Sequence, residues 1–221
     1  FAEELEKIGF FRMKSEPNLY HHRESNVYLI LYVDDLPMFG NEQQARLLFQ
    51  KIQEKVLLRP TGELSPGSPI NFLGRELVHN GDSVDLRTIS GYIAGILSEM
   101  PMSHCNSLST PGTSEGILDG DESVGIDAHK LYRRIVGKLQ WLCPVRPDLN
   151  YSVKELARAL SAPTKAHVTK LKHLRRYLKG TKNVYFRIRP DFPNSMVNRM
   201  VEIDVFVDSD WAGCRDSRKS T

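Results

Sequence analysis

This chain of 221 residues has few cysteines, no long apolar run and a small net charge. Cys105, Cys143 and Cys214 lie far apart without CxxC or Cys/His ligand spacing, which favours free thiols in a reducing compartment over a zinc site. No apolar run is long enough to span a bilayer and no signal-peptide core is present, so no membrane partner is expected. The net charge of +3 means that nucleic-acid binding would have to come from local clusters of basic residues.

The most informative stretch that is present runs from residue 27 to residue 40, where an apolar, β-prone segment ends in Asp34 and Asp35. Its Val, Ile and Tyr content predicts a buried strand. Because an unpaired buried carboxylate is costly, the two acids need water, a cation or a hydrogen-bonded turn. Two interpretations stay open: a solvent-exposed hairpin tip, since turns favour Asp, or a magnesium site in which a tight turn brings both carboxylates to one ion.

The segments around this stretch predict a small sheet covered by helices. The spacing of Ala2, Leu5 and Ile8 predicts a short helix that ends at Gly9, and residues 19–23 predict a short strand. After the acidic pair, Asn41 is a good N-cap, and the following helix should pack under the hairpin sheet. Its apolar stripe consists of Ala45, Leu48, Phe49, Ile52 and Val56.

A second hairpin is predicted by residues 70–79 and 83–89, with a turn beginning at Asn80 and Gly81. Gly74 falls inside the first of these strands, where the lack of a Cβ would let another backbone or a nucleotide approach closely. An ordinary hairpin glycine is the alternative. Residues 90–100 then predict a helix.

The second half of the chain is helical in pattern. Residues 103–126 are poor in large apolar side chains and are the best candidate for a linker. Beyond them, three helices with short connections predict a small bundle, in which Asp127 and Asp148 are expected to cap the first two helices and Pro163 to open the third.

Basic residues gather on the third of these helices with no acid between them. Such a run is either a solvated face or a surface that binds the phosphates of a nucleic-acid duplex. The candidates for backbone contact are Lys170, Lys172, Arg175, Arg176 and Lys179, with Lys138 on the first helix.

The end of the chain predicts a strand over residues 184–189, a linker, and a further strand over residues 202–207 that ends at Asp208. From the residues alone, Asp208 and Asp210 are a polar strand end.

Several blocks of sequence, taken in order, are similar to the Pol polyproteins of copia-type LTR retrotransposons over nearly the whole chain. Tyr32-Val33-Asp34-Asp35 resembles the hairpin motif of reverse transcriptases. The later blocks are Phe72 to Glu76, Leu131 to Leu139, Arg146 to Leu149, Leu174 to Thr181, and Asp208 to Gly213.

The resemblance implies an α+β fold in which an incomplete polymerase palm, an antiparallel sheet with helices, precedes a thumb-like helical bundle and the first strand of an RNase H-like domain. The implied boundaries are 1–102 for the palm with its primer-grip hairpin, 103–126 for a linker, 127–189 for the helical region, 190–201 for a second linker and 202–221 for the start of RNase H.

The resemblance also implies RNA-directed DNA polymerase chemistry, with two Mg²⁺ ions (or Mn²⁺) and a primer-template as partners. Asp34 would be the firmer metal ligand and Asp35 the accessory one, and Asp208 would be the leading catalytic aspartate of RNase H. Tyr32 and Val33 would lie beside the primer terminus. Phe72, Leu73 and Gly74 would form the primer grip. The implied partners are an RNA template, a DNA primer or RNA–DNA hybrid, dNTPs and the rest of the Pol polyprotein.

The family uses a third aspartate from an earlier strand, and neither that strand nor the fingers region is recognisable here. Because the sequence begins at Phe1 and stops inside a motif at Thr221, we expect an internal fragment of a longer polyprotein that does not polymerise DNA alone. The expected location is the cytoplasm, in the virus-like particle of the element, or the nucleus.

Pro37 departs from the family pattern, because related sequences usually carry an aliphatic strand residue there. Proline cannot donate a ladder hydrogen bond, so it would lie at a sheet edge or just outside the turn, or it marks a decaying element.

Three hypotheses for the function of the chain remain: a piece of a polymerase, a non-catalytic nucleic-acid-binding remnant, and an inert remnant.

Overall fold

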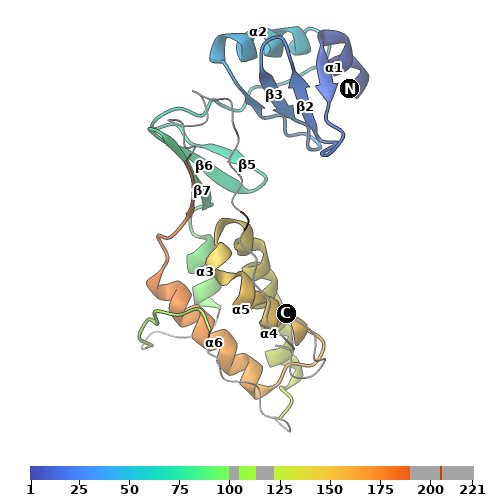
Figure 1. Cartoon of the computed structure of the whole chain (residues 1–221). Helices are drawn as coiled ribbons and strands as arrows, with labels where there is room; N and C mark the ends of the chain where they lie inside the picture. Colours follow the sequence, from blue (N-terminus) through green and yellow to red (C-terminus); the bar gives the residue numbers. More distant parts are fainter. Residues whose placement is uncertain (100–104, 113–121, 190–204, 206–221) are drawn as a thin grey trace. The chain divides into compact units, whose positions relative to one another are not determined.

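The computed structural model describes residues 1–99, 105–112, 122–189 and 205 of the chain, and it has an α+β fold (Figure 1). Contacts divide the chain into two compact units, Phe1–Ile188 and Arg189–Thr221. Nearly all of the described residues belong to the first unit. The expected RNase H strand at residues 202–207, with Asp208 after it, lies outside the described residues except for Val205.

The first sheet has four antiparallel strands in the order β1-β2-β3-β4. The helices α1 (Ala2–Ile8) and α2 (Glu42–Gln53) pack on it, as the sequence predicts, and Leu5, Leu48 and Ile52 join its buried face. Gly9 ends α1 in a left-handed conformation, and the Asn41 side chain accepts a hydrogen bond of 3.2 Å from the Gln44 backbone N–H. The strands are β1 (Phe10–Arg12), β2 (Leu19–His22), β3 (Val27–Ile30) and β4 (Met38–Phe39).

The second sheet is also antiparallel, in the order β5-β6-β7-β8. The expected single strand over residues 70–79 is wrong, because a two-residue turn at Leu73 and Gly74 divides it into β5 (Ile70–Phe72) and β6 (Arg75–Asn80). The next turn, at Gly81 and Asp82, leads into β7 (Ser83–Thr88) as expected. β8 (Phe186–Ile188) returns from the helical region and pairs with β7. The hairpin and the helical region therefore share a sheet, although the expected boundaries separate them.

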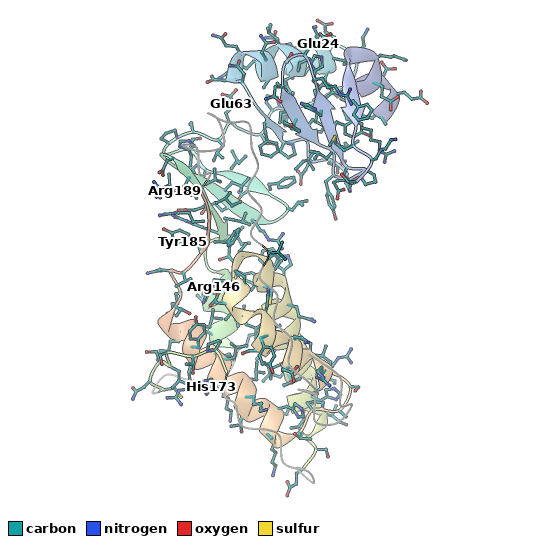
Figure 2. The ribbon with its side chains drawn as sticks, viewed as in Figure 1. Glu24, Glu63, Arg146, His173, Tyr185 and Arg189 are labelled. Atoms are coloured by element: carbon teal, nitrogen blue, oxygen red, sulfur yellow. The ribbon has the colours of Figure 1, made fainter. Side chains whose placement is uncertain are left out.

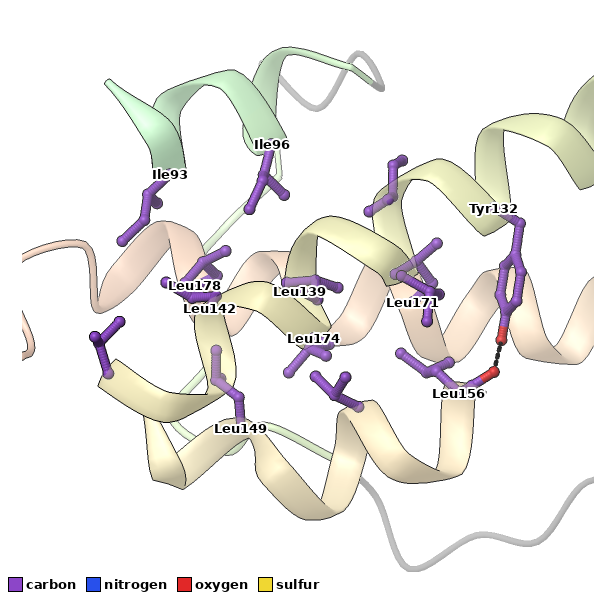
Figure 3. Packing of buried hydrophobic residues seen from close by; sticks show 14 residues of the cluster. Ile93, Ile96, Tyr132, Leu139, Leu142, Leu149, Leu156, Leu171, Leu174 and Leu178 are labelled. Carbon is purple, nitrogen blue, oxygen red and sulfur yellow. Dashed lines mark hydrogen bonds between the residues drawn. The ribbon is translucent and has the colours of Figure 1, made fainter. Parts of the chain in front are cut away.

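Helices form the remainder of the first unit, and none of those described is both long and apolar enough to cross a membrane. Their core is built from apolar side chains of every helix in this half of the chain, including Ile96, Leu139 and Leu174, which are fully buried (Figure 3). The Tyr132 hydroxyl donates a 2.7 Å hydrogen bond to the Leu156 carbonyl inside this core, and burial raises the pKa of that tyrosine. The elements are α3 (Tyr92–Ser98), α4 (Ile126–Leu142), the 3-10 turns η1 (Cys143–Val145) and η2 (Pro147–Leu149), α5 (Asn150–Arg158) and α6 (Lys165–Gly180).

Two of the expected helix caps are wrong. Gly125 occupies the N-cap of α4, and Asp127 lies in the first turn of that helix. Asp148 does not cap α5, whose N-cap residue is Leu149. The expected opening of the third helix is confirmed, because Thr164 is the N-cap of α6 and its backbone N–H donates to Nδ1 of His167 at 3.2 Å.

Asp148 instead belongs to a polar network around Arg146, whose side chain is only 1% exposed. The Arg146 guanidinium donates to both Asp148 oxygens, at 2.9 and 2.7 Å, and to the backbone and side-chain oxygens of Thr181, each at 2.8 Å. The Tyr177 hydroxyl also donates to Asp148, at 2.9 Å. Burial opposes ionisation of Asp148, but the hydrogen bonds from Arg146 and Tyr177 hold its pKa below the usual value. The network joins the η1–η2 turn to the end of α6.

Asp148→Asn should remove the charge that compensates Arg146 and leave a buried cation without its counter-ion. We expect the free energy of unfolding of the full chain to fall by about 2–3 kcal/mol in urea titrations with an unchanged slope. Asp127→Asn, at an exposed acid in the first turn of α4, is the matched control and should cost about 0.5 kcal/mol. Equal losses in the two variants would contradict a buried ion pair at Asp148.

Candidate functional site

The two acids predicted as metal ligands lie at the tip of the β3–β4 hairpin. Tyr32 and Asp35 exchange both backbone hydrogen bonds, at 3.0 and 2.9 Å, so the loop between them is the two-residue pair Val33 and Asp34. The side chains from Tyr32 to Asp35 are all exposed. The predicted tight turn is therefore present at the acidic pair.

Val33 is the first central residue of this turn and has a φ of +52°, with its side chain 81% exposed. A two-residue hairpin with positive φ at that position normally carries glycine, because a Cβ is strained there. A β-branched residue with positive φ is a backbone outlier that persists only when its surroundings impose it. Here the two Tyr32–Asp35 hydrogen bonds impose it.

The side-chain carboxylates of Asp34 and Asp35 make no hydrogen bond or ion pair with any other described residue. Their oxygens are therefore available to a hard cation such as Mg²⁺, which prefers carboxylate and water ligands. Two carboxylates are an incomplete set, and no group of three or more His, Cys, Asp or Glu side chains within residues 1–99, 105–112 and 122–189 is placed to hold a metal ion. The chemistry of the two carboxylates suits a hard cation, whose further ligands would have to come from outside these described residues.

Pro37 lies between the hairpin tip and β4, and it is opposite Ile30 of β3. The Ile30 N–H donates to the Pro37 carbonyl at 3.0 Å, and proline has no N–H with which to return the second bond of this pair. Of the alternatives, the sheet-edge position is confirmed, since β4 is the last strand of its sheet. A proline at this position nevertheless removes one ladder hydrogen bond close to the two acids.

Of the expected primer-grip residues, Phe72 ends β5, and Leu73 and Gly74 form the turn to β6. Leu73 and Gly74 both have positive φ, 50° and 70°, which is the pattern of a two-residue hairpin turn. A Cβ on Gly74 would lie 3.1 Å from the Trp141 ring, and the guanidinium of Arg75 covers that ring at 5.0 Å. The turn and Trp141 of α4 thus both favour glycine at this position, and no pattern in the sequence indicates the contact with Trp141.

The expected nucleic-acid contact of Arg175 does not fit its position. Its side chain is fully buried, and its guanidinium donates to the carbonyls of Ile96 and Leu97 at 3.0 and 2.6 Å, near the end of α3. Burial lowers the pKa of Arg175 and the charge of Glu99 opposes this shift. Arg175 therefore stabilises the end of α3 from within the core.

Other basic residues of α6 hold residues 105–112 against the helix. Arg176 donates to the Asn106 carbonyl at 2.7 Å, Lys179 to the Cys105 carbonyl at 2.9 Å, and His173 hydrogen-bonds to the Thr110 carbonyl at 3.0 Å. Part of the expected linker is therefore attached to α6 by His173 and by two side chains that the sequence predicts as phosphate contacts, Arg176 and Lys179.

Lys138 is also engaged, because it forms an ion pair with Glu99, which Arg134 contacts at 2.7 Å. Burial disfavours the Glu99 carboxylate, yet the hydrogen bonds from Lys138 and Arg134 hold its pKa below the usual value. Among the candidates, Lys172 is exposed and Lys170 half-buried, and no described acid lies within ion-pairing distance of either.

Comparison with known proteins supports a retroelement origin. The chain is 29% identical to a retrovirus-related Pol polyprotein from transposon RE1 of Arabidopsis thaliana, over 97% of the chain but only 14% of that polyprotein. It is 28% identical to the Pol polyprotein from transposon TNT 1-94 of Nicotiana tabacum, over its full length and 17% of the relative. An uncharacterized mitochondrial protein of Arabidopsis thaliana is 33% identical over 88% of the chain and 76% of that protein. None of the family models and none of the solved structures matches the chain.

These relatives place the chain among the retrovirus-related Pol polyproteins, of which it spans a small part. The chain belongs to the Pol polyproteins of copia-type retrotransposons. The resemblance of its sequence blocks to this family is thereby confirmed.

Val33→Gly should relieve the strain at the hairpin tip. We expect a gain of up to about 1 kcal/mol in unfolding free energy, because relief of the positive φ exceeds the entropy cost of glycine. Val184→Gly, at another exposed valine whose φ is not positive, should instead lose about 0.5–1 kcal/mol. Equal losses at both positions in urea unfolding would show that the Val33 backbone is not strained.

Arg175→Ala tests whether this basic residue of α6 stabilises the fold. Loss of the buried guanidinium leaves two carbonyls without their donor, so we expect the unfolding free energy to fall by about 3 kcal/mol. Lys172→Ala, three positions away and exposed, should change it by less than about 0.5 kcal/mol. Thermal and urea unfolding of the two variants would check this, and an unchanged Arg175→Ala stability would contradict its buried role.

Proposed function

We propose that this chain is the C-terminal palm and thumb portion of a copia-type reverse transcriptase, running into the start of RNase H. The observation that carries the proposal is the strained Tyr32–Asp35 hairpin, which presents two carboxylates without partners at the tip of a rigid sheet. Strain at an exposed tip is characteristic of functional sites, where the surrounding structure maintains it.

In this proposal Asp34 and Asp35 hold Mg²⁺ or Mn²⁺, with Asp34 as the firmer ligand. The bound ions would activate a primer 3′-hydroxyl and neutralise charge on the leaving pyrophosphate. The chain itself fixes the two carboxylates by the turn, and Tyr32, which is 48% exposed, is free to contact the primer terminus. The free edge of β4 is where an earlier strand of the polyprotein would add and bring the third aspartate.

The Leu73–Gly74 turn would contact the primer strand as the grip, with Trp141 fixing its position. RNA template, DNA primer or hybrid duplex would bind the basic helices through their phosphates. Lys172 and Lys170 are the side chains best placed for this role, because the other candidates already bind groups of the chain itself. Asp208 would supply the leading RNase H carboxylate. The assembled polyprotein would act in a cytoplasmic virus-like particle or in the nucleus.

A second candidate function is that of a non-catalytic nucleic-acid-binding remnant. Two observations favour it: Pro37 removes a hydrogen bond beside the acids, and a mitochondrial relative matches the chain over 76% of that relative's length. In this case the fold and the basic surface would persist without chemistry at the hairpin.

Asp34→Asn in the full-length polyprotein should reduce templated primer extension by roughly a hundredfold or more, because an amide is a poor ligand for Mg²⁺. Duplex affinity, measured by fluorescence anisotropy, should stay nearly unchanged. Asp35→Asn should cost less, and Asp127→Asn, at an exposed acid outside the hairpin, should cost nothing.

The two candidates give different results in this assay. Unchanged extension in Asp34→Asn would reject the catalytic assignment. A full-length polyprotein that binds duplex but extends no primer, with or without the substitution, would support the remnant. The isolated 221 residues should extend no primer in either case.

A further inference from the structure

A cleft of about 250 Å³ opens beside the second sheet and involves none of the hairpin acids. It lies between the end of β7, the start of α3, the η1 turn and the residues that lead into β8. Leu86, Ile93 and Val145 are apolar residues of its lining, and Arg87, Lys182 and Tyr185 are polar ones. None of the described residues that line it is acidic. The lining of the cleft therefore combines apolar with cationic residues.

Arg87 is held in place by a buried carboxylate behind it. Asp85 is 0% exposed and accepts hydrogen bonds from Arg87 at 2.7 Å and from Arg187 at 2.6 Å. These hydrogen bonds, the one from Arg187 above all, keep the pKa of Asp85 below its usual value despite burial. Two guanidinium groups thus share one carboxylate, and one positive charge stays uncompensated within this group of three.

The Tyr185 ring lies against both guanidinium groups, with centroid distances of 4.3 Å to Arg87 and 5.4 Å to Arg187. Tyr185 comes directly before β8, it is 36% exposed, and it is labelled in Figure 2. The two guanidinium groups lie over the ring and restrict it, and the part of the residue that they leave exposed is the part that a ligand could contact. An ordered, accessible aromatic ring beside fixed cations is a typical stacking platform for a nucleobase.

Lys182 and Asn183 complete the polar side of the cleft. Both are exposed, and no acid within the described residues pairs with the Lys182 ammonium group. A phosphate near Arg87 and Lys182 would meet one planar and one point-like cation, and the Asn183 amide can donate to or accept from a base edge.

We propose that this cleft binds one nucleotide of a single-stranded nucleic acid. The base enters against the apolar lining and the Tyr185 ring, and its phosphate binds Arg87 and Lys182. The volume suits a single base, and the cationic side with no acid in the lining favours an anionic ligand such as a nucleotide. The inference takes nucleic acid as ligand from the proposed function, but it uses none of the residues assigned there.

The test is binding of fluorescein-labelled (dT)₁₂ to the full chain, followed by anisotropy over a range of salt concentrations. Lys182→Ala should weaken binding and reduce the salt slope by about 0.7, because one phosphate contact is lost. Tyr185→Ala should weaken binding about fivefold or more. Lys51→Ala removes an exposed lysine of α2 as the charge-matched control and should have no effect.

An oligonucleotide of the same length with abasic sites separates base insertion from charge. It should bind the unaltered chain several-fold more weakly than (dT)₁₂, and Tyr185→Ala should abolish this preference. Thymidine monophosphate and inorganic phosphate are competitors that distinguish a free nucleotide or phosphate site from a strand site, and both should compete weakly.

The proposal is overturned if Lys182→Ala behaves like Lys51→Ala, if abasic and base-bearing strands bind equally, or if inorganic phosphate alone displaces the strand. Asn183→Asp puts a carboxylate at the exposed margin without disturbing the core, so loss of binding in a folded variant is expected even if Tyr185→Ala proves unstable. Extension by the full-length polyprotein at saturating primer-template should survive Lys182→Ala, so failure here is distinct from failure at Asp34.

Discussion

The buried guanidinium of Arg146 is the interaction on which the helical half of the chain depends. It joins Asp148 in the η1–η2 turn to both oxygens of Thr181, at the end of α6. Residues 182–185 follow at once and lead into β8, so this contact also sets where the last strand meets β7. Two sequence blocks that resemble the Pol family, Arg146 to Leu149 and Leu174 to Thr181, thus meet in one polar network. Their first role is to hold the helices and the sheet together.

Hydrogen bonding to oxygen atoms of the chain itself also explains the basic residues of α6. A run without acids suggests a surface for phosphate, but Arg175, Arg176 and Lys179 donate to backbone carbonyls of the chain itself. Carbonyls near helix ends and in extended segments need donors, and long cationic side chains supply them over several ångströms. Charge composition alone does not distinguish these two uses. Burial does, because a fully buried arginine cannot reach a solvated phosphate.

The sequence pattern predicts those features that local chemistry determines. Helical stripes, the Asn41 cap and the tight turn at the acidic pair follow from residue spacing and turn preference, and the structure has them. The sequence pattern does not predict the break at Gly74, because the strand pattern continues through it and the close approach of Trp141 comes from a distant helix. The Asp148 cap was wrong because Arg146, two residues earlier, competes for the same carboxylate. These errors arise where tertiary contacts decide between two locally acceptable structures.

The acidic residues of the chain fall into two physical groups, and this division bears on function. Asp85, Asp148 and Glu99 are paired with arginine or lysine, and the polar network around each of them joins two parts of the fold. Asp34 and Asp35 are exposed and pair with no described residue, and the turn that carries them is maintained by backbone hydrogen bonds alone. The fold therefore gains nothing from their charge. Two adjacent carboxylates on a strained turn, unused by the structure itself, support the proposed metal site, because carboxylate oxygens are ligands that a hard divalent cation prefers.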